Sequence, residues 1–333
     1  MLESVFPNLL SMSESPITIL FTSAGRRVGL MNAFRTSIER QGESCRLLAA
    51  DLEPEWSSAC QVADDAFSVP RIGKGYAEAV LDLCREQSVD IVIPTLDPEL
   101  EPFAEAQQLF EDAGVWLVVS SQEACSVFAS KTRSAAFFES VGLATPAVLT
   151  SPNLDEGPLF AKRERSSSSV GATKVTSSAQ LSFLKESDPD LMYQPFIEGT
   201  EFTIDLYLDR KGQLHDWVAR RRVEVRAGEV SKAETCRDHD LADAVQALAP
   251  HLQHCQGPLT LQVIREADTG MIWYIEINPR FGGGFPLAFA NGMDVPAYLE
   301  AERKGMPLPV PREHPPGMRM LRYDEQVVRH SVS

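Results

Sequence analysis

The chain is short of positive charge and of long apolar runs. Its 333 residues include 31 Lys and Arg against 47 Asp and Glu, a formal net charge of −16. A general nucleic-acid binder must neutralise phosphates with Lys and Arg, so this balance argues against that class. No apolar run reaches the ~18–20 residues that span a membrane, and the N-terminus, with Glu3 and Glu14, lacks the basic start of a signal peptide. We therefore expect a cytoplasmic protein with no nucleic-acid or membrane partner.

Several motifs of common enzyme and metal-binding classes are also missing. The six cysteines form no C-x-x-C pair and do not lie near histidines at zinc-finger spacing, so reduced thiols are expected rather than disulfides or zinc. No G-x-S-x-G nucleophile motif occurs, which leaves hydrolase chemistry unsupported. Only Gly25 and Gly29 follow the first apolar strand, so the dinucleotide fingerprint is incomplete and an NAD-linked oxidoreductase is disfavoured.

What the sequence does contain is 44% hydrophobic residues and a repeating β–α pattern that begins at Ile17. This content supports folded cores. Alternating strands and helices predict a parallel sheet covered by helices, which is a Rossmann-like unit. Its strands are expected at 17–22, 46–50, 90–93 and 115–119, and its helices at 28–41, 76–87 and 98–113.

After residue 120 the pattern changes to helices mixed with hairpins, which predicts an α+β region. A hairpin is expected from 201–208 and 213–226, around a turn at 209–212, and the tail from Met306 is expected to be loose or extended. Further strands are expected at 159–162 and 191–196, and helices at 122–128, 131–141, 179–186, 238–249, 285–291 and 295–303.

The most informative segment is 261–285, LQVIREADTGMIWYIEINPRFGGGF. Two strand-like runs flank a turn at 267–270, which predicts a hairpin. Glu276 and Asn278 project from one face because strand side chains alternate, and Gln262 lies near the start of the first run. One carboxylate and two amide oxygens form an all-oxygen set that suits Mg²⁺. A hydrogen-bonded structural strand end is the alternative.

A cation follows these candidate metal ligands. Arg280 stands two residues after Asn278, and a glycine run occupies 282–284. A guanidinium beside metal ligands is expected where an anion lies between them, such as a metal-bound phosphate. The glycines would let the backbone approach that ligand closely.

Two lysines and a serine-rich loop are further candidates for binding phosphate. Lys162 ends a strand and is followed by RERSSSSVG, whose hydroxyl and N–H groups could hold phosphate oxygens, although serine runs are often linkers. Lys131 begins a helix after the plausible N-cap Ser130, a position that attracts anions but is also common on surface helices.

Two other segments carry candidate ligand contacts. In YQPFIEGTE, residues 193–201, free backbone groups could meet an adenine edge and Glu201 the ribose hydroxyls, or the segment is a hinge. In WVARRRVEVR, residues 217–226, alternation places Arg220, Arg222 and Arg226 on one face with Arg221 opposite. Such a patch in an acidic protein favours phosphate or substrate-carboxylate binding over surface salt bridges.

The order of these features resembles the ATP-grasp superfamily over residues 17–305. It is most similar to short proteins related to the carbamoyl-phosphate synthase large subunit and to the pyrrolysine-biosynthesis ligase. The similarity is carried by TSAGRRVGLM, PTLDPEL, RRRVEVRAGEVSK and EINPRFGGGFPL. It implies a flexible extension at 1–15, a Rossmann-like domain at 16–120, a two-part ATP-grasp domain at 121–305 with a lid at 145–197, and a tail at 306–333.

The resemblance also implies a role for each candidate residue. Lys131 and Lys162 would contact the ATP phosphates, and Arg280 the transferred phosphoryl group. Arg220 and Arg222 would receive the acceptor carboxylate or the γ-phosphate. The flap would close with Ser167, Ser168, Ser169 and Gly171; Gln194, Pro195 and Phe196 would contact adenine, Glu201 the ribose, and Gln262, Glu276 and Asn278 the Mg²⁺ or Mn²⁺ ion.

The function implied is an ATP-dependent carboxylate–amine ligase that works through an acyl phosphate. Its partners would be a small carboxylic acid and an amine, and by resemblance it could be a homodimer. A carbamoyl-phosphate-synthase-like kinase that forms an acyl phosphate remains an alternative. A nucleotide-binding regulatory module with little turnover is another.

Overall fold

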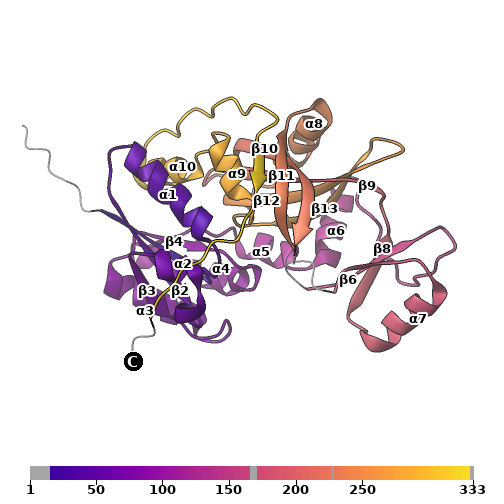
Figure 1. Ribbon diagram of the computed structural model, residues 1–333, viewed down its shortest axis with the longest axis horizontal. Helices are drawn as coiled ribbons and strands as arrows, with labels where there is room; N and C mark the ends of the chain where they lie inside the picture. Colours follow the sequence, from indigo (N-terminus) through magenta and orange to yellow (C-terminus); the bar gives the residue numbers. More distant parts are fainter. Residues whose placement is uncertain (1–15, 166–170, 227, 331–333) are drawn as a thin grey trace, which may run out of the picture.

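The computed structural model describes residues 16–165, 171–226 and 228–330 of the chain. These residues form three β-sheets with helices around them (Figure 1). The extension expected at 1–15 lies outside the described residues. A parallel N-terminal sheet is followed by two antiparallel sheets, so the predicted α/β fold class is confirmed.

The N-terminal sheet has five parallel strands in the order β3-β2-β1-β4-β5. Strand β1 lies at its centre and is buried along its whole length. The order reverses between β1 and β4, so the loops after these strands lie at a topological switch point, where α/β folds bind ligands. The strands are β1 (Ile17–Thr22), β2 (Cys45–Asp51), β3 (Asp65–Ser68), β4 (Ile91–Pro94) and β5 (Trp116–Leu117).

Helices connect and cover this sheet, and two more lead toward the rest of the chain. Ser121 and Ser130 cap the two later helices by accepting backbone N–H groups with their hydroxyl oxygens. The helices are α1 (Val28–Arg40), α2 (Ser58–Val62), α3 (Tyr76–Gln87), α4 (Asp97–Asp112), α5 (Gln122–Phe128) and α6 (Lys131–Ser140), and a 3₁₀ turn, η1, occupies Pro54–Trp56.

A three-stranded antiparallel sheet in the order β7-β6-β8 projects to one side with helix α7 (Figure 1). Its own small apolar core includes Leu159, Val175 and Leu181. The elements are β6 (Leu159–Arg163), β7 (Thr173–Val175), α7 (Ser178–Ser187) and β8 (Leu191–Pro195).

The central sheet has six strands in the order β13-β12-β9-β10-β11-β14. Helix α8 packs on it through Leu241, Val245 and Leu248. The strands are β9 (Gly199–Leu208), β10 (Leu214–Arg226), β11 (Glu229–Cys236), β12 (Gly257–Glu266), β13 (Ile272–Asn278) and β14 (Arg319–Leu321); the helices are α8 (His239–Leu248), η2 (Ala249–His251), α9 (Phe285–Ala290) and α10 (Val295–Arg303).

An aromatic cluster joins the central sheet to the N-terminal sheet. Phe281 and Phe285 flank the glycine run and are buried with ring centroids 4.6 Å apart. Phe34 of α1 packs edge-on against Phe281 at 5.7 Å. Burying an aromatic side chain of this size contributes about 1.5–3 kcal/mol. The cluster therefore holds the glycine run against the carboxyl-end loops of the N-terminal sheet.

Candidate active site

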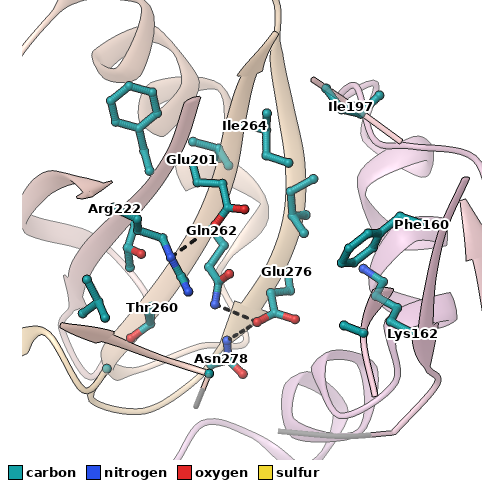
Figure 2. A pocket seen from close by; sticks show the side chains of 18 of the residues that line it. Phe160, Lys162, Ile197, Glu201, Arg222, Thr260, Gln262, Ile264, Glu276 and Asn278 are labelled. Atoms are coloured by element: carbon teal, nitrogen blue, oxygen red, sulfur yellow. Dashed lines mark hydrogen bonds and ion pairs between the residues drawn. The ribbon is translucent and has the colours of Figure 1, made fainter. Parts of the chain in front are cut away.

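A pocket lies between the three-stranded and the central sheets (Figure 2). Phe160 and Lys162 of β6 face it from one side, and Gln262, Glu276 and Asn278 face it from the other. The residues that line the pocket come from positions as far apart in the chain as 27 and 284. The fold thus brings together groups that are far apart in the sequence.

The three predicted metal ligands lie side by side on the central sheet. Gln262 of β12 is the direct cross-strand partner of Glu276 of β13, and Asn278 lies two residues along the same strand. Both amide nitrogens donate to Glu276 Oε1, at 2.8 Å from Gln262 and 3.1 Å from Asn278. The predicted grouping is therefore observed, and the amides fix the carboxylate in place.

The donor set fits magnesium bound together with ATP better than magnesium alone. It supplies one carboxylate and two amides. The parts of the chain that the structure describes hold no cluster of three or more His, Cys, Asp or Glu side chains arranged for a metal. Mg²⁺ is usually held by one or two carboxylates, waters and substrate phosphates. Rotating either amide would turn its oxygen toward the ion.

Lys162 enters the same pocket from the opposite sheet (Figure 2). Burial lowers the pKa of its ammonium to about 8; Lys131 also lowers it, whereas Glu276 raises it. Lys131, at the start of α6, lines the pocket as well. Two lysines that crowd each other in a buried place favour an anionic ligand between them.

An apolar region of the pocket suits a purine base. Phe160 and Ile197 lie on one side and Ile264 on the other (Figure 2). Phe160 and Ile264 were missed in the sequence. The signal was present, since each stands two residues from a predicted site residue, Lys162 or Gln262, on the same face of its strand.

The predicted adenine link is in the pocket, but two of its polar groups are already bonded. Gln194, Pro195 and Phe196 all line the cavity. The Gln194 amide nitrogen donates to Pro146 O at 2.5 Å, and the Phe196 backbone N–H donates to Pro158 O at 3.0 Å. The Gln194 amide and the Phe196 N–H are therefore structural.

The arginine patch is only partly as predicted. Arg220 and Arg222 line the pocket, whereas Arg226 forms an exposed ion pair with Glu224 at 2.8 Å. The cause is a register irregularity around Glu224, which breaks the alternation along β10. Placing Arg226 on the same binding face was wrong.

The two arginines that do line the pocket have carboxylate partners. Arg222 lies 3.3 Å from Glu201, the predicted ribose ligand, which is itself in the wall. Arg220 is fully buried and donates to Asp205 at 2.9 Å.

Arg280 lies where the central sheet meets the N-terminal sheet. Its Nη2 donates to Asp97 Oδ2 at 2.6 Å, and the side chain is largely buried. Burial works against the charge, but the Asp97 carboxylate outweighs it and raises the pKa of Arg280. Asp97 begins α4 within PTLDPEL, a motif to which no side-chain role was assigned from the sequence.

The serine flap is only partly described. Ser167, Ser168 and Ser169 lie outside the described residues. Gly171 has a φ of +76°, which glycine adopts without strain, and the next residue, Ala172, lines the pocket.

Comparisons with known proteins agree with this arrangement. Residues 19–118 match the family model described as PylC-like, N-terminal domain. Residues 187–326 match the model described as ATP-grasp in the biosynthetic pathway with Ter operon. None of the helices in the described ranges is long and apolar enough to cross a membrane.

Individual relatives point the same way. A D-alanine–D-alanine ligase from Marinobacter nauticus is 29% identical over 165 residues, which cover 46% of this chain and 51% of the relative. The chain thus spans about half the length of that enzyme. The L-amino acid ligase from Bacillus licheniformis superposes with a TM-score of 0.65 at 16% identity, covering 87% of this chain and 75% of that one.

A third similar structure is the biotin carboxylase domain dimer of 2-oxoglutarate carboxylase from Hydrogenobacter thermophilus, in complex with MgADP, ADP and bicarbonate. Its TM-score is 0.69 at 15% identity, over 91% of this chain and 73% of that one. The fold is therefore the one that these ligase and carboxylase structures share. The resemblance to the ATP-grasp superfamily predicted from the sequence is confirmed.

Proposed function

We propose that this protein is an ATP- and magnesium-dependent carboxylate–amine ligase that acts through an acyl phosphate. The observation that carries the proposal is the facing arrangement across the pocket. Lys162 stands on one sheet and the Gln262, Glu276 and Asn278 group on the other, with an apolar base-sized region beside them. An anion with a bound metal and an attached ring system satisfies all three parts.

In the first step a carboxylate oxygen of the acid attacks the γ-phosphorus of ATP, and ADP leaves. Lys131 and Lys162 hold the phosphates, and Arg280 neutralises charge on the group in transfer. Glu276, with Gln262 and Asn278, would hold magnesium beside the phosphates, and the ion would supply positive charge that lowers the electrostatic cost of bringing the anions together. Phosphoryl transfer depends mainly on such positioning and charge neutralisation.

In the second step the amine nitrogen attacks the acyl carbon, phosphate leaves, and the nitrogen loses a proton. A new C–N bond replaces the C–O bond to phosphate. Water would destroy the acyl phosphate, so the three-stranded sheet, with Phe160 and Lys162 over the pocket, serves to exclude it. Glu201, half exposed beside Arg222, is the candidate partner of the ribose hydroxyls.

The same proposal covers the substrates, the oligomeric state and the cellular compartment. The substrates are a small carboxylic acid and an amine, and a homodimer is consistent with the dimer formed by the similar biotin carboxylase domain. All six cysteines are unpaired, which supports a reducing cytoplasm.

The test is ADP release by the purified protein with Mg²⁺-ATP and a panel of carboxylic acids, each with and without amines. The proposal expects stimulation that requires both an acid and an amine. Stimulation by an acid alone would indicate an acyl-phosphate-forming kinase instead. ATP binding with no stimulation by any combination would indicate a regulatory module, and failure to bind ATP would overturn the nucleotide site.

A further inference from the structure

One end of the pocket is crowded by arginines from separate segments of the chain. Arg27, Arg220 and Arg280 line the pocket, and Arg322 bonds two lining residues, Glu229 and Gly283. The glycine run 282–284 makes room for the arginines. A Cβ on Gly283 would lie 2.9 Å from Arg27 Nη1 and 3.2 Å from Arg322 Nη2, and one on Gly284 would lie 2.4 Å from Arg220 Cζ. Three guanidinium groups thus pack against one three-residue loop, and a Cβ at position 283 or 284 would force them to shift.

Carboxylates pair with the four arginines at this end of the pocket. Arg27 and Arg322 share Glu229, the first at 3.6 Å and the second by a direct hydrogen bond. Arg220 and Arg280 each pair with one aspartate of their own. Within the described part of the chain, these four guanidinium groups thus share three carboxylate partners.

Two further observations point to an anionic ligand here. Arg220 is 2% exposed, yet its Nη1 has no hydrogen-bond partner among the residues that the structure describes. Burial lowers the pKa of Arg27, and the neighbouring Arg280 and Arg322 lower it further. A buried donor without an acceptor and a destabilised cation would both be relieved by a bound carboxylate.

One of these arginines, Arg322, lies in the C-terminal segment, directly after strand β14. Strand β14 pairs antiparallel with β11, and the Arg322 backbone N–H donates to Ser231 O at 2.9 Å. This holds the Arg322 side chain against Gly283 and Glu229. Beyond it the chain continues across the N-terminal sheet region, where Arg329 donates to Gln61 O at 3.4 Å (Figure 1). The segment is thus anchored on both sides of Arg322.

We propose that Arg322 and Arg27 bind the carboxylate of the amine substrate, which makes that substrate an amino acid. The inference rests on the proposed ligase function. A guanidinium has five N–H donors, so both arginines can bind a second carboxylate while bonded to Glu229. Glu229, between the two cations, then faces the substrate ammonium. An amino acid carries an ammonium and a carboxylate group on the same carbon. These two groups complement a site in which a carboxylate, Glu229, lies between two arginines.

The first test compares Arg322→Gln with Arg319→Gln. Arg319 lies on β14 but is largely exposed, and its partner is Glu234 at 3.6 Å. ADP release is measured with Mg²⁺-ATP and amino acids in all pairwise combinations, beside the same compounds as carboxamides. We expect Arg322→Gln to raise KM for the amine-donating amino acid at least about tenfold, with KM for ATP and kcat little changed, and Arg319→Gln to match the wild type. An unchanged KM in Arg322→Gln, or wild-type use of carboxamides equal to that of amino acids, would overturn the proposal.

The second test does not need turnover, so it separates this subsite from the ligase function. The protein is treated with phenylglyoxal, and arginine modification is mapped by mass spectrometry. A pooled mixture of amino acids should slow modification of Arg322 and leave Arg319 unaffected, whereas the pooled carboxamides should protect neither. Protection without ADP release would leave the subsite standing and the ligase reaction wrong. ADP release without protection of Arg322 would show that the subsite is wrong.

Discussion

At the scale of single residues, the proposed role of Lys162 predicts that ATP binding depends on pH. Its pKa is lowered to about 8 by burial, so the free protein loses this positive charge above that pH. Bound phosphate favours the protonated form, which means that binding above pH 8 must also take up a proton. We expect KM for ATP to be flat below pH 8 and to rise up to about tenfold per pH unit above it.

Two substitutions check this prediction. In the Lys162→Arg variant the arginine keeps its positive charge at high pH, so KM for ATP should rise little above pH 8. The Lys162→Met variant should bind ATP weakly at every pH, and its KM for ATP should not rise above pH 8. A wild-type KM that stays constant to pH 9.5 would exclude Lys162 from the phosphate site.

Glu276 carries the single negative charge of the proposed metal set. Glu276→Gln should lower ATP turnover at least about 100-fold, because the ion would lose its carboxylate ligand. The thermal unfolding midpoint should stay close to that of the wild type, since the new amide can still hydrogen-bond its neighbours. Glu266→Gln, at the far end of the same hairpin, is the matched control and should turn over normally.

The metal itself can be followed with Mn²⁺ by electron paramagnetic resonance. We expect weak Mn²⁺ binding by the protein alone and tight binding only with ATP present, because the chain supplies one carboxylate and two amides. Tight binding without ATP would require ligands beyond Gln262, Glu276 and Asn278.

Glu229 and Arg322 were missed for a physical reason that does not apply to Phe160 and Ile264. Glu201, Gln262 and Glu276 lie on strands whose alternation could be read, and the pocket contains them. Glu229 and Arg322 gain their positions from the pairing of β14 with β11 and from the glycine loop. Arg322 is 39 residues from Gly283 and 93 from Glu229 along the chain, and local periodicity does not encode contacts over such separations.

At the scale of elements, the start of α6 links the N-terminal region to the three-stranded sheet. Ser130 Oγ accepts the Arg133 backbone N–H at 3.1 Å and also bonds the Glu164 carboxylate, just beyond β6. Ser130→Ala should cost about 1 kcal/mol of stability as a lost N-cap. It should also raise KM for ATP severalfold, because Lys131 and the end of β6 lose a shared anchor.

Ser121→Ala is the control for that experiment. Ser121 caps α5 in the same way, accepting the Ala124 N–H at 3.2 Å, but makes no side-chain contact with the three-stranded sheet among the described residues. A similar loss of stability with an unchanged KM is expected. Equal KM values in the two variants would show that α6 does not position the nucleotide site.

Most helices and the longer strands could be predicted from the sequence, whereas several short strands could not. The expected helices at 28–41 and 76–87 are observed within a residue, as α1 and α3. The strand expected at 115–119 is only Trp116–Leu117, and the edge strand β3 was missed because it is mostly exposed and has no clear alternation. Strands of three residues, β7 and β14, are defined by their partners rather than by their own residues.

At the scale of the whole molecule, a partly buried histidine fixes the tail to the central sheet. His314 bonds Asp216 of β10 at 2.8 Å and Asn291 O at 3.0 Å, and Tyr298 donates to the same aspartate at 2.8 Å. Burial alone would lower the pKa of His314, but the two hydrogen bonds outweigh it and raise the pKa above its usual 6.5.

This ion pair predicts a pH-dependent stability. Because the folded-state pKa is raised, the stabilisation is complete below the unfolded value near 6.5 and is lost as pH rises through the folded value. His314→Gln should therefore cost about 1.5–3 kcal/mol at pH 5.5 and less at pH 9. Urea unfolding at several pH values measures the difference. His254→Gln, on the surface, should leave the curve unchanged, and a penalty for His314→Gln that grows with pH would contradict the account.

The central claim is that the substrate carboxylate is activated by phosphorylation before the amine attacks. The most direct test labels both carboxylate oxygens of the acid found in the ADP-release panel with a heavy oxygen isotope and analyses the phosphate released. An acyl phosphate transfers one labelled oxygen to each phosphate, so the account predicts phosphate with one heavy oxygen for every product formed. Product accompanied by unlabelled phosphate would show that the carboxylate never bonded to phosphorus and would contradict the mechanism.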